Sequence, residues 1–374
     1  MGRSRRRKGV RRFFGITFRM VLVIAAVCLL LAYISSYIDP AKFSVPIFFG
    51  LYFIPILAVN LLLLLIALIS RSKSAWITII ALLPALLFAE RFVRFGGEKD
   101  ADGTKIKIET YNVGLFRLSK NRMPYKATMD SIFCQIGNCD ADIVCLQEVY
   151  LDSLQAAKTL LPQYRWRTYH LISHQNGKRS GNIIFSRYEI TKGGVIKFKS
   201  STNLSLFADI VVEKDTLRVY NNHLQSYAIS PTALIQKIRS KKTFSEEVSN
   251  EIISVHNKFR SSVIQRSRQV GAVLDNINKS PYPYVVCGDL NDIPMSYTYH
   301  KLSYGRKDTF KEAGHGFSAT FSVLWPLFRI DYVFIPEDWA GISHKTVRCN
   351  FSDHYPVIAE FSTGAKANKD SAKE

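Results

Sequence analysis

The sequence predicts an α+β domain of two packed β-sheets flanked by helices, preceded by three apolar segments. Two observations predict this organisation. Residues 13–93 are almost entirely apolar, whereas residues 104–362 contain ten short strand-like runs and only a few helix-like stretches. The runs are rich in Val, Ile, Tyr and Phe, which favour strands. Many strands with few helices are typical of a layered α+β fold.

The N-terminal part has the pattern of a membrane anchor. Apolar segments cover about residues 15–38, 43–70 and 75–93, and short polar breaks separate them. Each segment reaches the roughly 20 residues that a helix needs to span a bilayer. A cleaved signal peptide would have one short apolar core instead of three. The sequence therefore predicts three transmembrane helices and an integral membrane protein.

The distribution of positive charge predicts the orientation of this anchor. Seven Lys and Arg residues precede Phe13, and the break between the second and third segments contains Arg71 and Lys73. The positive-inside rule places both groups in the cytoplasm. Three spans then place the rest of the chain on the other side, which in a bacterium means a multi-pass inner-membrane protein with a periplasmic domain. Three further basic residues between positions 91 and 99 count against this orientation.

Beyond residue 95 the composition predicts a polar linker at 96–103, a compact domain at 104–362 and a disordered tail at 363–374. The formal net charge of the chain is +20, and residues 1–100 contain 14 Lys and Arg against 4 Asp and Glu, which leaves +10 on the remainder. A basic domain suits polyanions such as nucleic acid or anionic lipid headgroups, although solubility alone would also explain the charge. The six cysteines have no zinc-site spacing, and pairing of Cys134 with Cys139 would need an oxidising compartment.

The apolar pattern also gives the expected elements of the domain. Helix-like spacing occurs at 125–136, at 151–160 and over a long basic stretch from about 231 to 278. No internal repeat is visible. Strand-like runs occur at 106–112, 142–149, 165–172, 182–187, 204–212, 217–223, 284–290, 329–335, 347–351 and 356–361.

Polar side chains with catalytic chemistry lie at or near the ends of these strand-like runs. Loops at strand ends are where a rigid scaffold holds catalytic groups. Each cluster alone has a plain alternative, such as a surface salt bridge, an Asx turn or a structural histidine, but together they describe one active site. The residues are Asn112, Glu148, His223, Asp289, Asn291, Asp331, Asp353 and His354.

Three of these residues have the chemistry of a phosphate site. Glu148 ends an apolar strand, where a carboxylate needs a partner. A hard cation such as Mg²⁺ fits, because it takes one or two carboxylates and keeps water and substrate phosphate as its other ligands. Asp289 and Asn291 are two positions apart, so in extended backbone they point to the same face. They could therefore address one phosphate or one water.

The two histidines complete the set. His223 ends a strand-like run and could donate a hydrogen bond to a phosphate oxygen or a leaving group. Asp331 lies in an otherwise apolar strand, and a buried aspartate needs a cation or a protonated histidine. His354, which follows Asp353 directly, is the expected partner of Asp331.

In this order, the clusters resemble the endonuclease/exonuclease/phosphatase family of DNase I-like, metal-dependent phosphohydrolases. The resemblance covers nearly all of residues 104–362. It implies a four-layer α/β sandwich, with two mainly antiparallel sheets face to face and helices outside. The matching segments are Thr110–Val113, Leu146–Val149, Ser180–Arg187, Asn222–Leu224, Gly288–Asn291, Ile330–Tyr332 and Ser352–Pro356.

The resemblance implies a metal side of the site. Glu148 would bind Mg²⁺ or Mn²⁺, with Asn112 and Asp353 close by. The ion would neutralise charge that develops during attack on phosphorus. Some relatives have an acidic residue two positions after the first Asn, but this chain has Gly114 there. The resemblance therefore does not carry a second metal site at that position.

The resemblance also implies a role for the other residues. His354, oriented by Asp331, would act as general base or phosphate ligand, and Asp289 would position the attacking water. Phosphate oxygens would be held or protonated by Asn291 and His223. Substrate contacts would come from Asn291, His223, Ser186 and Arg187.

These features together predict a membrane-anchored, Mg²⁺-dependent phosphodiesterase, with nuclease as the first expectation. A lipid-headgroup phosphodiesterase of the sphingomyelinase kind, or a phosphomonoesterase, is the alternative, because the anchor would hold the domain at a bilayer. A catalytically inactive binding domain would have lost part of the cluster, which is intact here. The choice among substrates stays open because relatives share the core and differ in their loops. The sequence indicates no protein partner.

Overall fold

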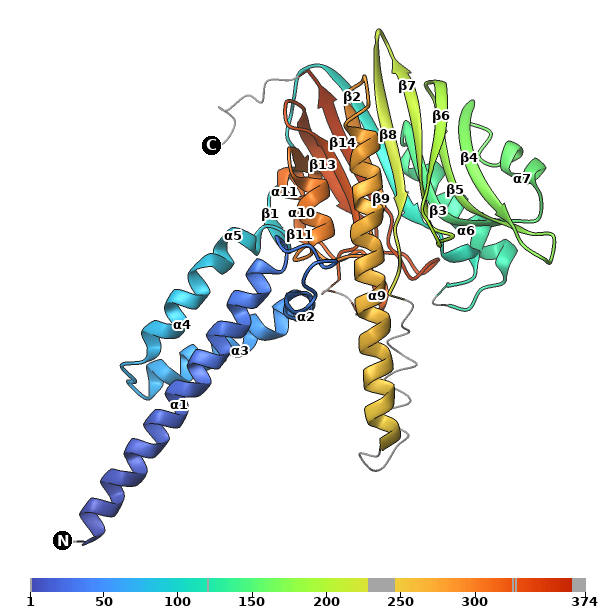
Figure 1. Cartoon of the computed structure of the whole chain (residues 1–374). Coiled ribbons are helices and arrows are strands. Elements are labelled where there is room, and N and C mark those ends of the chain that lie inside the picture. The colour runs from blue at the N-terminus through green and yellow to red at the C-terminus, as the bar shows by residue number, and fades with distance from the viewer. Residues whose placement is uncertain (1, 120, 228–245, 325, 327, 365–374) are drawn as a thin grey trace. The chain divides into compact units, whose positions relative to one another are not determined.

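The computed structural model describes residues 2–119, 121–227, 246–324, 326 and 328–364. The chain divides into two compact units (Figure 1). The first comprises Met1–Glu90 with Met295–His300, and the second comprises Arg91–Pro294 with Lys301–Glu374. The second unit contains the sheets and all residues of the predicted site.

The first unit is built from apolar helices. Tyr33 stacks on Phe88, with ring centroids 5.3 Å apart, and the Asn60 amide donates to the Ala25 carbonyl at 3.1 Å. These contacts join the first helix to the third and the fifth. The helices are α1 (Gly2–Ile34), α2 (Val45–Leu51), α3 (Phe53–Ile69), α4 (Ala75–Leu82) and α5 (Leu86–Ala89), with a 3₁₀ turn η1 (Leu83–Ala85) between the last two.

The prediction of three separate membrane spans is wrong for the described residues. One helix, Phe13–Ile34, is long and apolar enough to cross a membrane. The second apolar segment forms α2 and α3, which meet at an angle of 72° and make at most one broken span. The third forms a shorter apolar stretch, Ala75–Ala89, and its last residue, Val93, begins a strand, β1 (Val93–Phe95).

Proline explains the interruptions. Pro55 has no N–H to donate to the carbonyl of Leu51, and its ring would clash with that carbonyl, which disfavours one continuous helix from α2 into α3. α2 ends at Leu51 accordingly. Pro84 lies within the 3₁₀ turn that separates α4 from α5. Hydropathy registers the length of an apolar segment but not these breaks.

The second unit contains two six-stranded mixed sheets, as the predicted α+β class requires. Each sheet has a single parallel pair, β8 with β9 in the first sheet and β2 with β3 in the second. The first sheet has the order β10 (Arg306–Asp308), β12 (Asp331–Pro336), β9 (Tyr284–Asp289), β8 (Asp215–His223), β7 (Leu204–Val212) and β6 (Glu189–Lys197). The second has the order β13 (Ala340–Thr346), β14 (Val357–Thr363), β2 (Thr104–Asn112), β3 (Ile143–Leu151), β5 (Arg179–Ser186) and β4 (Trp166–Ser173).

The two sheets pack face to face through a buried aliphatic core. Ile108 and Ile143 of the second sheet and Val219 and Val285 of the first belong to this core. The alternation of side chains along each strand sends every second residue into it. A second apolar cluster lies on the other face of the second sheet, under the helices α6 (Tyr125–Cys139) and α7 (Leu154–Thr159).

Helices also cover the first sheet. Tyr220 of β8 donates to the side-chain oxygen of Asn276 at 2.9 Å, which fastens the long helix α9 (Glu246–Ile277) to this sheet. The remaining described elements are α10 (Tyr297–Ser303), α11 (Thr309–Ala313), the 3₁₀ turns η2 (Gly114–Phe116) and η3 (Ser322–Leu324), and a strand β11 (His315–Phe317) that pairs with β1.

Some expected elements differ from the structure. Residues 347–351 form no strand, and β13 lies just before them; the lysine and histidine in it weaken its apolar signal. β6 was not predicted because it contains Gly193 and Gly194, which have low strand propensity. Both glycines are needed, since a Cβ at Gly193 would lie 2.3 Å from the Thr168 hydroxyl and one at Gly194 would lie 2.3 Å from the Phe207 ring.

Other expectations concern the ends of elements. Residues 231–245 of the predicted long helix lie outside the described residues, as does the predicted tail from 365 onward. The predicted linker is partly bound, because the Lys99 N–H donates to the Ile342 carbonyl at 2.9 Å. All six cysteines are free thiols, including Cys134 and Cys139 on α6.

A buried ion pair stabilises the β7–β8 hairpin. Arg218 Nε and Nη2 donate to the two oxygens of Asp209 at 2.5 and 2.8 Å. The two residues are only 6% and 2% exposed. Removal of one partner from such a pair leaves the other charge buried without compensation, which is more costly than loss of the attraction alone.

We therefore expect Asp209→Ala to lower the free energy of unfolding by about 3–5 kcal/mol. Urea unfolding of the full chain in detergent, followed by tryptophan fluorescence, measures this loss. The matched control is Asp215→Ala, because Asp215 is an exposed aspartate of the same hairpin. A loss for Asp209→Ala no greater than that of the control would contradict the assignment.

Candidate active site

Strand pairing brings the predicted residues to one edge of the two sheets. Asp289 at the end of β9 is the register partner of His223 on β8 and of Asp331 on β12. In the second sheet, Asn112 at the end of β2 is the register partner of Gln147 on β3. Because these positions lie at strand ends, side chains that are far apart in the sequence converge where the sheets meet.

A β-bulge directs Glu148 into this edge. Glu148 has a φ of 52°, and the pairing of β3 with β5 shifts register between Leu146 and Val149. Leu146 and Val149 both pack in the second apolar cluster, under α6 and α7, although strict alternation would put them on opposite faces of the sheet. The bulge therefore takes Glu148 out of the alternation. A non-glycine residue in this conformation costs on the order of 1–3 kcal/mol, and bulges of this kind are common beside active sites.

The Asn112 amide joins the two sheets. Its Nδ2 donates to Glu148 Oε1 at 3.2 Å and to Asp289 Oδ2 at 2.9 Å, and its Oδ1 accepts from the Gly114 N–H at 3.0 Å. Asn112 and Glu148 belong to the second sheet and Asp289 to the first. One side chain therefore fixes the distance between two carboxylates that different sheets supply.

His223 lies between the same two carboxylates. Its Nε2 is 3.3 Å from Glu148 Oε1 and 4.0 Å from Asp289 Oδ2. Burial opposes protonation of this imidazole, but the contact with Glu148 outweighs it and raises the pKa of His223. Burial alone would raise the pKa of Glu148. The hydrogen bond with His223 and the charge of that imidazole outweigh burial and lower the pKa to about 2. Glu148 is therefore ionised at neutral pH.

His354 forms a second histidine–carboxylate pair. Its Nδ1 is 3.0 Å from Asp331 Oδ2 and 3.3 Å from Oδ1, which leaves Nε2 directed at the site, 3.8 Å from Asp289 Oδ2. Burial opposes the charge, but Asp331 and Asp289 raise the pKa of His354 well above its ordinary value. The Thr320 hydroxyl accepts from the Asp331 N–H at 3.1 Å and so holds the end of β12 in place.

Asp289 is fixed by the loop that follows it. Its Oδ1 accepts from the Asn291 backbone N–H at 2.8 Å and its Oδ2 from Asn291 Nδ2 at 3.0 Å. The preceding Gly288 has a φ of +119°, and a Cβ there would lie 2.1 Å from the Asn222 carbonyl oxygen. Only glycine allows this approach. Burial raises the pKa of Asp289 to about 6.

Asp353 is close enough to both His354 and Glu148 to interact with their charges. The Ser352 hydroxyl is 3.3 Å from Asp353 Oδ1 and donates to the Asn112 carbonyl at 2.9 Å, which ties this loop to β2. Burial and the negative charge of Glu148 raise the pKa of Asp353. A cation between the two carboxylates would relieve this repulsion.

The cluster fits a divalent metal ion. It contains four carboxylates, from Glu148, Asp289, Asp331 and Asp353, against two imidazoles. Carboxylate and amide oxygens are the ligands that hard cations prefer. Asp289, Asp331 and His354 also lie close enough together to share an ion. Asp331 is already paired with His354 Nδ1, so its charge is partly compensated without an ion.

Two predicted substrate residues are not brought to this cluster. Ser186 ends β5 and is the register partner of Ile143 at the start of β3, whereas Glu148 lies near the other end of β3. Arg187 forms an ion pair with Asp140. The prediction that Ser186 and Arg187 contact substrate is therefore not supported by their position. Both lie toward the opposite end of the sheet.

A buried amide network beneath the site was not assigned any role from the sequence. Gln147 Nε2 donates to Asn221 Oδ1 at 2.7 Å and to the Thr110 hydroxyl at 2.9 Å, and Asn221 Nδ2 donates to the Leu146 and Ile183 carbonyls at 3.0 Å each. Gln147 and Asn221 are fully buried and belong to different sheets. The sequence signal that could have revealed this network is the presence of amide side chains at inward-facing positions of two apolar strands.

The comparisons with known proteins agree with this geometry. The profile of the Endonuclease/Exonuclease/phosphatase family matches residues 110–354, and a domain of unknown function (DUF8431) matches residues 12–92. No curated protein matches the chain in sequence. An endonuclease/exonuclease/phosphatase from Beutenbergia cavernae DSM 12333 has a TM-score of 0.51 and 19% identity, over 70% of this chain and 72% of that one. The human Nocturnin catalytic domain, solved with a bound sulfate anion, has a TM-score of 0.50 and 16% identity, over 70% and 97%.

At these identities the solved structures show the shared fold. The family profile spans all the residues of the cluster from Asn112 to His354 and covers more than half of the chain. The chain therefore belongs to the endonuclease/exonuclease/phosphatase family and is a hydrolase.

Proposed function

We propose that this protein is a membrane-anchored, Mg²⁺- or Mn²⁺-dependent phosphodiesterase, and that it acts as a nuclease. The observation that carries this proposal is the pair of histidine–carboxylate contacts that face each other across the sheet edge. His223 contacts Glu148 at 3.3 Å, and His354 contacts Asp331 at 3.0 Å. Asp289 lies between them. Two imidazoles around one carboxylate can bind the oxygens of a single phosphate.

The residues divide the work of phosphodiester hydrolysis. Asp289, fixed by Asn291, accepts a hydrogen bond from the attacking water and orients it. His354, held by Asp331, and His223 donate to phosphate oxygens, where negative charge increases in the transition state. Glu148, with Asp353 and Asn112 beside it, would hold the metal. When bound, the metal would neutralise charge on the phosphate.

The choice of a nucleic acid rests on charge. The formal charge of residues 101–374 is +10, from 36 Lys and Arg against 26 Asp and Glu. Positive charge supplies most of the affinity for a phosphate backbone. The alternative is a lipid-headgroup phosphodiesterase or a phosphomonoesterase, which the anchor would place near its substrate. Comparison of both substrate classes with the same purified chain decides between them.

α1 supports the membrane location. The span Phe13–Ile34 is apolar, and seven basic residues precede it. A single crossing by α1 with a cytoplasmic N-terminus places the second unit on the extracytoplasmic side, which is the periplasm in a bacterium, whereas a second crossing by the bent pair α2 and α3 would return it to the cytoplasm. We propose this orientation, and a membrane protein with a catalytic domain outside the cytoplasm, in place of the three-span arrangement.

Glu148→Gln and His354→Ala should each lower kcat/KM for phosphodiester hydrolysis at least about 100-fold, because each removes a group that acts on the transition state. Hydrolysis of a labelled oligonucleotide by the full chain measures the effect, and circular dichroism checks the fold. Glu213→Gln is the matched control, since Glu213 is an exposed residue of the β7–β8 turn. Near wild-type turnover in both site variants would refute the assignment.

The activity should have an acid limb near pH 6. Burial raises the pKa of Asp289 from 3.8 to about 6, so the carboxylate takes up a proton at a higher pH than an ordinary aspartate does. Below that value kcat/KM should fall by about tenfold per pH unit, as a single required carboxylate is protonated. A pH–rate profile at saturating Mg²⁺ measures the limb.

The variant Asp289→Asn serves as control for this profile. It cannot lose a proton, so its residual activity should lack the acid limb. A wild-type profile that stays flat down to the ordinary aspartate value of 3.8 would contradict the role of Asp289, as would an unchanged limb in the variant.

A further inference from the structure

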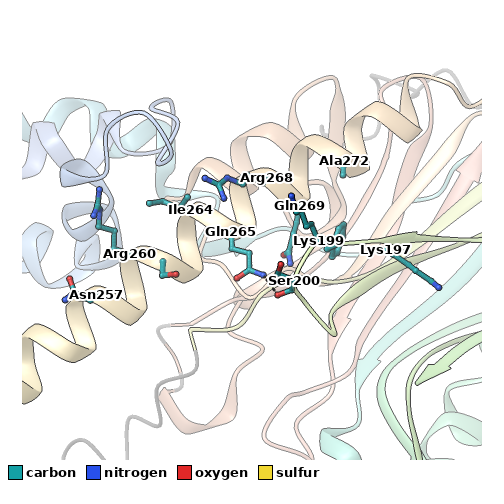
Figure 2. A pocket seen from close by; sticks show the side chains of 12 residues that line it. Lys197, Lys199, Ser200, Asn257, Arg260, Ile264, Gln265, Arg268, Gln269 and Ala272 are labelled. Atoms are coloured by element: carbon teal, nitrogen blue, oxygen red, sulfur yellow. Dashed lines mark hydrogen bonds between the residues drawn. The ribbon is translucent and has the colours of Figure 1, made fainter. Parts of the chain in front are cut away.

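A basic pocket lies between α9 and the segment that follows β6. Its volume is about 890 Å³. Figure 2 shows that one wall comes from α9 and the other from Lys197, Lys199 and Ser200. We call this cavity the basic pocket. The side chains that matter for the argument are Lys197, Lys199, Arg260, Gln265, Arg268 and Gln269.

The charge of the basic pocket is of one sign. Lys197, Lys199 and Arg268 are exposed, and no Asp or Glu occurs among its described lining residues. The sequence explains why neither wall contains a carboxylate, because it has no acidic residue between Glu189 and Asp209 or between Glu251 and Asp275. Cations that line a cavity without carboxylates attract anions from solvent.

Hydrogen bonds connect the basic pocket to the catalytic cluster. Gln269 Oε1 accepts from the Gln225 N–H at 2.8 Å. Gln225 follows Leu224, whose N–H donates to the Asp289 carbonyl at 3.0 Å and whose carbonyl accepts from Asn291 Nδ2 at 2.9 Å. Leu224 and Gln225 therefore connect the α9 wall of the basic pocket to the loop that carries Asp289 and Asn291.

The opposite side of α9 fixes the helix to the same loop. Arg266 is fully buried, and its Nε donates to Asp292 Oδ2 at 3.0 Å. Tyr227 donates to the other oxygen of Asp292 at 2.8 Å. Arg268, two residues further along the helix, is exposed in the pocket instead. α9 thus holds a cationic surface at a fixed position relative to Asn291.

We propose that the basic pocket binds the phosphate backbone of a nucleic-acid strand whose scissile phosphodiester lies at the catalytic cluster. The proposal deepens the proposed function and rests on it. Lys197 and Lys199 come from one wall and Arg268 from the other. Cations on both walls of a cavity match several backbone phosphates better than one isolated phosphate group.

The composition of the basic pocket favours a nucleic acid over a lipid surface. No lining residue is among the exposed large apolar side chains of the described chain. A surface that docks on a bilayer combines positive charge with apolar side chains that enter the headgroup region. Asn257, Ser261 and Gln265 offer hydrogen bonds instead.

The test is the double variant Lys199→Gln/Arg268→Gln in the full chain. Anisotropy of a labelled single-stranded oligonucleotide, with EDTA present to prevent cleavage, gives the Kd at several salt concentrations. Loss of two phosphate contacts should weaken binding about tenfold and reduce the magnitude of the salt slope by roughly 1.4. The control Lys214→Gln/Lys279→Gln removes the same charge at exposed positions outside the pocket and should bind like wild type.

Turnover separates this inference from the proposed function. The ratio of kcat/KM for the oligonucleotide to kcat/KM for bis(p-nitrophenyl) phosphate should fall in the pocket variant by the same factor as the affinity. If wild type hydrolyses neither substrate, the proposed function fails, while the anisotropy still decides whether the pocket binds the strand. An unchanged Kd and salt slope, or an equal loss in the control, overturns the proposal. So does lost binding to phosphatidylserine vesicles with oligonucleotide binding intact, which would assign the pocket to lipid.

Discussion

The hydrogen bonds of the Asn112 amide hold the active site together, because they connect a carboxylate of one sheet to a carboxylate of the other. Its Nδ2 contacts Glu148 at 3.2 Å and Asp289 at 2.9 Å, and these carboxylates come from different sheets. Without the Asn112 amide as a donor between them, the Glu148 and Asp289 carboxylates would repel each other, and one of the two would take up a proton. The same arrangement places His223 and His354 on either side of Asp289. The positions of the groups that we propose to orient water, bind phosphate and bind metal thus depend on the packing of one sheet against the other.

The core beneath the site explains how this packing stays in register. A sheet interface made only of aliphatic side chains tolerates small shifts, because hydrophobic contact has no direction. Gln147 and Asn221 restrict such shifts, since each is fully buried and its hydrogen bonds reach the other sheet. An unmade bond in this environment costs about 1–3 kcal/mol, so a displaced sheet would lose several at once. The strained backbone of Glu148 is maintained by the same surroundings.

The sequence was sufficient for the two-sheet α+β class and for the cluster residues that converge, because each lies at or near one end of an apolar run. It could not indicate that Glu148 leaves the strand alternation, since a bulge depends on the pairing partner. Ser186 and Arg187 were misplaced for a related reason: a motif shows which strand they end, but only the antiparallel pairing with β3 shows that they lie at the far end. The extra membrane spans came from apolar length alone, without the effect of Pro55 and Pro84. The basic pocket joins residues near 198 to residues near 265, and no local pattern reports that contact.

The claim that a metal ion binds beside Glu148 is central to this account, and direct measurement of Mn²⁺ binding tests it without reference to any substrate. Electron paramagnetic resonance on the full chain in detergent counts free and bound Mn²⁺, with Glu213→Gln as the charge-matched control. We expect the wild type and the control to bind Mn²⁺ and Glu148→Gln to bind it at least about tenfold more weakly, since a carboxylate ligand is lost. Equal Mn²⁺ affinity in the wild type and Glu148→Gln would contradict it.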